Sequence, residues 1–235
     1  MPHELTQTLP ITLISKADYD KYTSRWITLL NEDDGKMDLR DYFYKDLLKL
    51  IGVRFDVNAI EYLVSSEATT TIKSRFCITT DEEGEELFNI ILFGTDKNDG
   101  ITTAYFLGTP YAQELGEDLP QCQLPTNLGE IWLEKWIKNE DFISRERFRN
   151  IYGYLQGYNF PLEDFIDATF KYKCSGLSVS LALHELYRPN VTDVATPTFT
   201  FNLVLQGILA DDEVAPARIA DADGLYDISA PSPPY

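Results

Sequence analysis

Two stretches of this sequence match each other: FNIILFG at Phe88–Gly94 and FNLVLQG at Phe201–Gly207. They lie 113 residues apart (201 − 88 = 113), and both keep the apolar pattern, the Asn and the final Gly. Each is a nearly continuous apolar run of strand length, which is typical of a central strand. We therefore expect two equivalent strands and a repeat within the chain.

The repeat extends upstream at an offset of 105 residues. The corresponding positions are Phe43, Gly52, Phe55, Ile60, Ile72, Ser74, Phe76 and Ile78 in the first half, and Phe148, Gly157, Phe160, Phe165, Leu177, Val179, Leu181 and Leu183 in the second. A longer hairpin loop at 187–194 accounts for the larger offset of the central strands. Trp26 and Trp136 each precede an Ile within a helical pattern.

Periodicity predicts a similar order of elements in both halves. In the first half we expect helices over 17–30, 39–51 and 58–64, and strands over 71–80, 87–93 and 101–107. In the second half we expect helices over 128–138 and 144–155, a short helix opened by Pro161, and strands over 170–186, 198–209 and 226–229.

These elements indicate an α+β fold made of two tandem copies of one unit. Each unit is helix-helix-helix followed by an antiparallel β-meander, and the two copies share one sheet or pack about a pseudo-twofold axis. We place the units at 1–120 and 121–235, with a linker over 109–125. The second unit ends in an irregular tail rich in Asp, Ala and Pro.

Composition narrows the classes of function. The 235 residues carry a net charge of −18, which disfavours nucleic acid as a partner, because phosphates attract Lys and Arg. We expect no membrane segment and no signal peptide, and hence a cytoplasmic protein. The three cysteines, Cys77, Cys122 and Cys174, are too scattered for a zinc site, so we expect neither metal nor cofactor.

Several short features together resemble a group of short, single-unit bacterial proteins of unknown function. These features are a helix from Ala17 to Trp26, the pattern Phe55, Ile60, Leu63, the turn Glu83-Gly84, the strand end Gly94-Thr95-Asp96, the turn Asp99-Gly100 and the tail at 226–235. The resemblance implies the fold of each copy and a bacterial cytoplasmic setting. It implies no activity and no functional residues.

Two loops and three reactive side chains are weak candidates for chemistry. The loops at 96–100 and 221–224 contain fragments of a calcium-binding pattern, but both lack the closing Glu and fit ordinary turns better. His184 lies beside Glu185 on a predicted strand, where neighbouring side chains face opposite ways. Cys77 and Cys174 are interpreted as structural thiols. We therefore predict no catalytic residues.

Two further groups are candidates for binding. Asn89 and Asn202 are the polar residues repeated inside the two apolar strands, so with His184 they could orient a small ligand, although a structural role is the simpler interpretation. Aromatic residues at helical spacing, including Trp26, Trp132, Trp136 and Tyr154, belong to the core or to a protein interface.

Our leading hypothesis is a non-enzymatic, acidic protein-interaction module of the bacterial cytoplasm, with a basic protein as partner. One alternative is a small-molecule-binding or enzymatic domain with a pocket at the interface between the repeats. A third hypothesis is an immunity-type protein that neutralises a basic partner, for which the charge is the only support.

Overall fold

The computed structural model describes residues 12–31, 38–45, 47–81, 83–112, 128–139, 142–150, 153–171, 174–186, 198–208 and 230–231. This part of the chain contains four α-helices, which are α1 (Lys16–Asn31), α2 (Val57–Val64), α3 (Leu128–Lys138) and α4 (Leu162–Phe170). Two short 3-10 helices, η1 (Leu39–Phe43) and η3 (Arg145–Phe148), precede strands. The predicted α+β class is confirmed.

The strands form two antiparallel sheets. The first has six strands in the order β1 (Thr12–Ile14), β6 (Tyr105–Leu107), β5 (Glu86–Thr95), β4 (Thr71–Thr80), β10 (Gly157–Pro161) and β13 (Ala230–Pro231). The second has the order β12 (Thr198–Ile208), β11 (Gly176–Leu186), β3 (Leu48–Asp56) and β2 (Tyr44–Lys45), and β7 (Thr109–Ala112) also pairs with β3. A small separate hairpin joins β8 (Arg149–Asn150) and β9 (Gly153–Tyr154).

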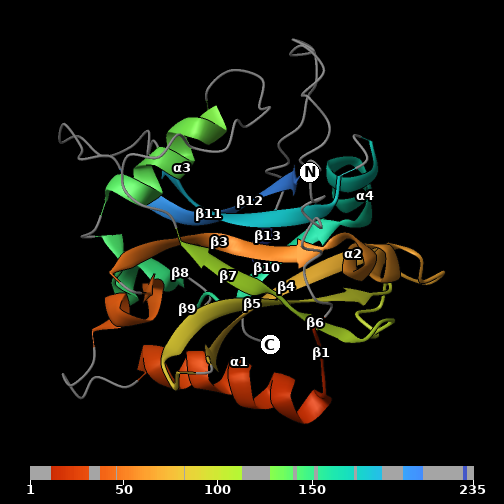
Figure 1. Ribbon diagram of the computed structural model, residues 1–235, viewed down its shortest axis with the longest axis horizontal. Helices are drawn as coiled ribbons and strands as arrows, with labels where there is room; N and C mark the ends of the chain where they lie inside the picture. The colour runs from red at the N-terminus through yellow and green to blue at the C-terminus, as the bar shows by residue number, and fades with distance from the viewer. Residues whose placement is uncertain are drawn as a thin grey trace, which may run out of the picture.

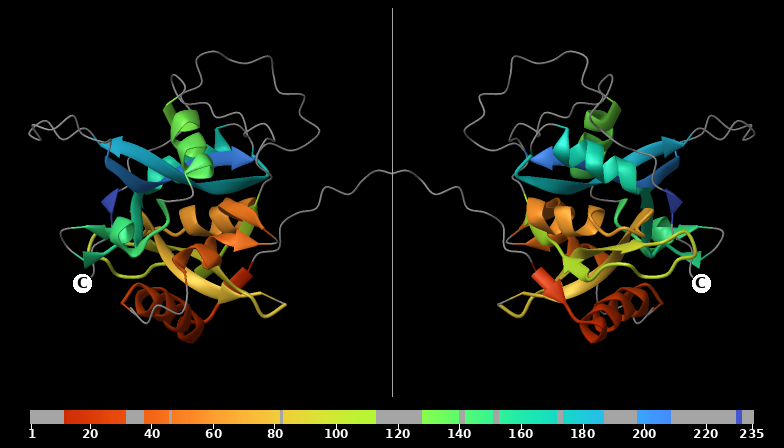
Figure 2. Two further views of the ribbon diagram at one scale, coloured as in Figure 1. Left: turned by 90° about the vertical axis from the view of Figure 1, so that its left-hand side faces the viewer. Right: turned by 90° about the vertical axis from the view of Figure 1, so that its right-hand side faces the viewer.

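The sheets lie between two helices. Figures 1 and 2 show α1 on the outer side of the first sheet and α3 on the outer side of the second. Under α1, the side chains of Tyr19 and Tyr22 pack on Ile91 and Phe93. Under α3, the buried side chains of Trp132, Leu133, Ala182 and Val204 form the corresponding cluster. The main core lies between the sheets and includes α2 and α4.

The two halves of the chain exchange strands. Strand β3 pairs with β11 of the second half, where Gly52 faces Ser180 and Phe55 faces Leu177. Strand β10 pairs with β4 of the first half, where Gly157 faces Arg75 and Phe160 faces Ile72. Both registers follow one offset, because 157 − 52 and 180 − 75 both equal 105. Each sheet therefore contains strands from both halves.

Two tryptophans make matching hydrogen bonds across the halves. The indole Nε1 of Trp26 donates to the carbonyl oxygen of Leu155 over 2.9 Å, and that of Trp136 donates to the carbonyl oxygen of Leu50 over 2.8 Å. Both indoles are fully buried. A buried indole N–H needs an acceptor, so each bond satisfies a donor and fixes one half against the other.

Helices α1 and α2 begin where the sequence supplies a capping side chain. Ser15 Oγ accepts a hydrogen bond from the N–H of Asp18 over 3.1 Å at the start of α1, as its position predicts. The Asp56 carboxylate accepts from the N–H of Asn58 over 2.8 Å at the start of α2. Helix α2 then buries Ala59, Ile60 and Leu63, which lie at helical spacing.

Most predicted elements are confirmed, but the second helix of each half is wrong. The segment predicted as a helix over 39–51 is the 3-10 helix η1 followed by β2 and the start of β3. The segment predicted as a helix over 144–155 is η3 followed by β8 and β9, with 151–152 outside the described residues. The helix-helix-helix order is therefore not found in either half.

Smaller corrections concern strand and linker boundaries. Residues 109–112, predicted as linker, form β7. Phe170, predicted in a strand, ends helix α4, and β11 begins at Gly176. The predicted strand over 101–107 is reduced to β6 and an isolated bridge at Ile101. The remaining linker, the 187–194 loop and the predicted strand at 226–229 lie outside the described residues.

Where the paired strands β10 and β4 approach each other closely, one added methyl group should strongly lower the stability of the protein. Gly157 has a φ of +147°, and a Cβ there would overlap the carbonyl oxygen of Ser74. We expect Gly157→Ala to lower the free energy of unfolding by about 3 kcal/mol or more. The control is Gly84→Ala, where φ is +89° but the space is open, and which should cost about 1 kcal/mol. Urea denaturation measures both, and equal losses would contradict the role of the close strand approach.

A buried carboxyl group on α4 predicts a dependence on pH. The side chain of Asp164 is buried, and its Oδ2 has no hydrogen-bond partner within the described residues. Burial, and then the charges of Glu163 and Asp167, raise its pKa above the ordinary value. The contribution of Asp164 to stability is therefore present at low pH and is lost as the pH rises through its raised pKa.

We therefore expect Asp164→Asn to be more stable than the parent protein at pH 7 and equally stable at pH 3. Urea unfolding of both proteins at each pH gives the difference in their free energies of unfolding. This difference isolates Asp164, because the other carboxyl groups are common to both proteins. A gain that is the same at both pH values would show that the charge of Asp164 is not the cause.

Candidate binding groove beside helix α2

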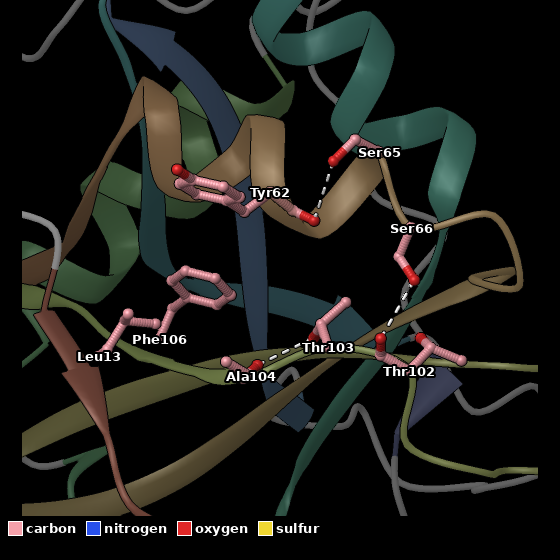
Figure 3. A pocket seen from close by; sticks show the side chains of 8 residues that line it. All are labelled: Leu13, Tyr62, Ser65, Ser66, Thr102, Thr103, Ala104 and Phe106. Atoms are coloured by element: carbon pink, nitrogen blue, oxygen red, sulfur yellow. Dashed lines mark hydrogen bonds between the residues drawn. The ribbon is translucent and has the colours of Figure 1, made fainter.

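An open groove lies between the end of α2 and the strands β1 and β6. Its volume is about 250 Å³, and its lining includes the side chains shown in Figure 3: Leu13, Tyr62, Ser65, Ser66, Thr102, Thr103, Ala104 and Phe106. The pairing of β1 with β6 places Leu13 directly opposite Phe106. Residues distant in sequence therefore form one surface.

Two of the three large apolar side chains that line the groove are exposed to solvent. Tyr62 and Leu13 are 64% and 61% exposed, whereas Phe106 is buried and only 3% exposed. The rings of Tyr62 and Phe106 are nearly parallel, with 6.5 Å between centroids and 15° between planes. Figure 3 shows the Tyr62 ring facing the Phe106 ring across the groove. Exposed apolar side chains that gather in this way are typical of a binding surface.

The serine and threonine hydroxyl groups of the groove already have hydrogen-bond partners within the protein. Ser66 Oγ donates to the carbonyl oxygen of Thr102 over 3.1 Å, and Thr102 Oγ1 lies 2.6 Å from Thr69 Oγ1. Thr103 Oγ1 donates to the carbonyl oxygen of Ala104 over 2.9 Å and accepts from the N–H of Gly94 over 2.8 Å. These bonds hold the loop at 101–104 in place, and none of these hydroxyls is paired with a base.

The lining consists of apolar side chains and hydroxyl groups. Among the described residues that line the groove there is no carboxylate, imidazole, thiol or amine that could act as acid, base or nucleophile. Exposed carboxylates are its sequence neighbours: Glu61 precedes Tyr62, and Glu67 follows Ser66.

The structure does not bring the three predicted ligand-binding residues together. Asn89 shares a face of the first sheet with Ile91, under α1, while Asn202 and His184 share a face of the second sheet with Ala182, under α3. Asn89 Nδ2 donates to the carbonyl oxygen of Gly108 over 3.0 Å, and its Oδ1 accepts from the N–H of Ile90 over 2.7 Å. These are contacts with the local backbone.

The other two residues also have close neighbours. Asn202 Oδ1 accepts from the N–H of Leu203 over 2.8 Å, which repeats the bond of Asn89 in the other strand. The ring of His184 packs on Trp132 with 4.3 Å between centroids. His184 is half-buried beneath α3, on the side of the molecule away from Asn89.

The residues predicted for an interaction surface lie mostly inside the protein. Trp26 and Trp136 are fully buried, and Trp132 is 5% exposed. Tyr154 is half-buried against the core. Their aromatic character therefore serves packing in this structure.

The remaining candidates for chemistry have structural surroundings. Burial raises the pKa of the Cys77 thiol well above its usual value, which disfavours the reactive thiolate, and Cys174 is also buried. The predicted turn at 96–100 is confirmed: Asp96 Oδ1 accepts from the N–H groups of Asn98 and Gly100, both over 2.8 Å. Asp99 pairs with Lys73 over 2.6 Å. The loop at 221–224 lies outside the described residues.

Within the described residues, no group of three or more His, Cys, Asp or Glu side chains is placed to hold a metal ion. No helix in the same residues is both long and apolar enough to cross a membrane.

Comparison with family models, with curated proteins and with solved structures finds no match for this chain. The proposed function therefore depends on the geometry of the molecule itself.

Sequence reasoning missed the groove, although one signal was present. Tyr62 lies outside the apolar stripe of Ala59, Ile60 and Leu63, so an aromatic ring on the outer face of α2 could have been noticed. The pairing of Leu13 with Phe106 joins residues 93 positions apart (106 − 13 = 93), and no local pattern indicates it.

The two rings of the groove should differ in their effect on stability. We expect Tyr62→Ala to change the free energy of unfolding by less than about 1 kcal/mol, because the ring is exposed. Phe106→Ala should cost about 3 kcal/mol or more, because that ring is buried. Thermal unfolding of the two variants compares them, and a large loss for Tyr62→Ala would mean that Tyr62 serves the fold rather than binding.

Proposed function

We propose that the chain is a non-enzymatic protein-interaction module that binds a large apolar side chain of a basic partner protein in the groove at Tyr62. The observation that carries the proposal is the exposure of Tyr62 and Leu13 on either side of Phe106. Exposed apolar groups that surround a hollow lose unfavourable contact with water when a partner covers them.

The size of the groove favours a side chain over a cofactor. Pockets for drug-sized ligands usually measure about 300–1,000 Å³ and enclose most of the ligand. This groove, at about 250 Å³, is smaller and open, so it fits one aromatic or large aliphatic side chain. Because the serine and threonine hydroxyls of the groove bond to the protein itself, most of the remaining contribution to affinity is apolar.

Surface composition supports the same site. The large hydrophobic side chains that the described residues expose are Leu13, Leu47, Tyr62, Ile101, Ile131 and Ile166. Two members of this set, Leu13 and Tyr62, line the same groove. Elsewhere the exposed hydrophobic residues are scattered, which is normal for a protein surface.

Charge favours a basic partner. The whole chain has a net charge of −18, and the exposed carboxylates of Glu61 and Glu67 lie next to the groove in sequence. Attraction between unlike charges speeds association and weakens as salt screens it. The same reasoning applies to an immunity-type protein, which would be one member of this class of partner-binding modules.

We further infer that the module consists of two copies of one α+β unit. The common offset of 105 residues in the exchanged strand pairs supports this, as do the matching tryptophan bonds and the matching bonds of Asn89 and Asn202. The hairpins β2–β3 and β8–β9 obey the same offset, since Tyr44 faces Lys49 and Arg149 faces Tyr154. The unit is helix, 3-10 turn, short hairpin, helix and β-hairpin.

Selection from a displayed library of random peptides tests the binding proposal. We expect the selected peptides to share an aromatic or large aliphatic residue flanked by Lys or Arg. The large residue matches the apolar groove, and the basic residues match the negative charge of the chain. Tyr62→Ala and Leu13→Asp should each weaken binding of a selected peptide at least tenfold. Binding should also weaken as salt rises from 50 to 300 mM.

The matched control is Ile131→Ala, which removes an exposed hydrophobic side chain on α3, away from the groove. It should leave the affinity unchanged. Peptides that bind equally well to the Tyr62→Ala variant, or that lack basic residues, would overturn the proposed site or the proposed partner respectively.

A further inference from the structure

We infer that the two halves of this chain are obligate partners that associate without the covalent link between them, and that Lys49 selects the second half as the partner of the first. The inference concerns the surface between the halves and is independent of the groove. It depends on three sets of contacts, which involve the backbone, the aromatic rings and Lys49.

The backbone contacts show what each half lacks. Strand β4 pairs with β5 of its own half on one edge and with β10 of the other half on the other edge. Strand β3 likewise lies between β7 and β11. If the halves separated, these edges would expose the backbone groups of five facing residue pairs in each exchanged contact. Unpaired edges of this kind readily accept another strand.

The aromatic core also needs both halves. Trp26 meets Phe148 with 5.2 Å between ring centroids, and Phe43 meets Trp136 with 5.5 Å. Phe43 and Phe148, which occupy equivalent positions, stack on each other at 5.7 Å. All four side chains are fully buried. Separation would expose them to water, so a solitary half would lose much of its hydrophobic core.

Lys49 gives the pairing its specificity. This residue of β3 is 4% exposed, and its Nζ donates to the carbonyl oxygens of Trp136 over 2.6 Å and of Asn139 over 3.1 Å. The same Nζ lies 4.6 Å from the centre of the Trp136 ring. The cation therefore sits at the C-terminal end of α3, where the last carbonyl groups of a helix lack intrahelical partners and the helix dipole favours positive charge.

Helix α1, the counterpart of α3 in the first half, does not offer the equivalent acceptor within its described residues. Helix α3 ends at Lys138, two residues after Trp136, so the Trp136 carbonyl is among the last four. Helix α1 continues to Asn31, five residues beyond the corresponding Trp26, so the Trp26 carbonyl lies within the helical bonding pattern. If two copies of the first half paired in the same way, Lys49 would be buried without these bonds. A buried cation needs partners, so this alternative pairing is disfavoured.

Cleavage of the full chain tests the inference. A protease site is inserted between residues 120 and 121, and complete cleavage is confirmed by mass spectrometry. Co-expression of 1–120 with 121–235 as separate chains provides the same test without a protease. We expect the halves to co-elute as a one-to-one complex at 100 µM, with the spectrum of the intact protein. Its melting temperature should rise with concentration, because unfolding now releases two chains.

The role of Lys49 is tested in the same cleaved protein. Lys49→Met should raise the dissociation constant of the halves about tenfold or more, because two charge-assisted hydrogen bonds are lost. Lys45→Met is the matched control: Lys45 is 39% exposed, pairs with Asp81 of its own half, and should change the constant less than twofold. Uncleaved Lys49→Met should keep its far-UV spectrum, because the intact chain holds the halves at high effective concentration.

Halves that elute separately, or that lose their structure at 100 µM, would overturn the obligate association. Equal dissociation constants for the parent and Lys49→Met proteins would overturn the selective role of Lys49. Neither result depends on whether a peptide binds at Tyr62, so the two proposals fail separately.

Discussion

The pairing of β3 with β11 and of β10 with β4 is the contact on which the rest of the structure depends. Because each half contributes a strand to the sheet of the other, both sheets are continuous only when the halves are together. The close approach at Gly52 and Gly157 follows from this arrangement, since a Cβ at Gly52 would lie 2.8 Å from the carbonyl oxygen of Val179. The indole bonds of Trp26 and Trp136 then fix the distance between the halves.

This arrangement determines where a binding site can lie. The surfaces between the sheets are filled by aromatic rings and aliphatic side chains, and the outer faces are covered by α1 and α3. Two of the exposed apolar side chains, Leu13 and Tyr62, lie together at one edge, where α2 meets β1 and β6. Binding of a partner at such an edge requires no opening of the core, which suits a rigid interaction module.

Local sequence patterns predicted those elements whose burial follows one period. Helices α1 and α3, the short helices α2 and α4, and the strands β4 and β11 show their periodicity in sequence, while β5 and β12 appear as nearly continuous apolar runs. The sequence match between the halves was visible because Phe88–Gly94 and Phe201–Gly207 carry similar apolar side chains. These features depend on neighbours within a few residues, or on identity between the halves.

Long-range pairing explains the errors. Residues 48–53 have the apolar spacing of a helix, but pairing with β2, β7 and β11 along this segment holds it as a strand. Leu47 has a φ of +68° in the turn between β2 and β3, which is incompatible with a helix there. Because leucine rarely adopts a positive φ, the sequence did not predict this turn. The groove was missed for a related reason, because the pairing of β1 with β6 brings Leu13 to Phe106.

Cross-strand nuclear Overhauser effects in the intact protein test the strand exchange most directly. The account predicts contacts between the backbone protons of Phe55 and Leu177 and between those of Phe160 and Ile72, which face each other across the exchanged pairs. Contacts that instead join β3 to β4 within the first half, and β10 to β11 within the second, would contradict it. That result would mean two independently closed units, with no exchange between them.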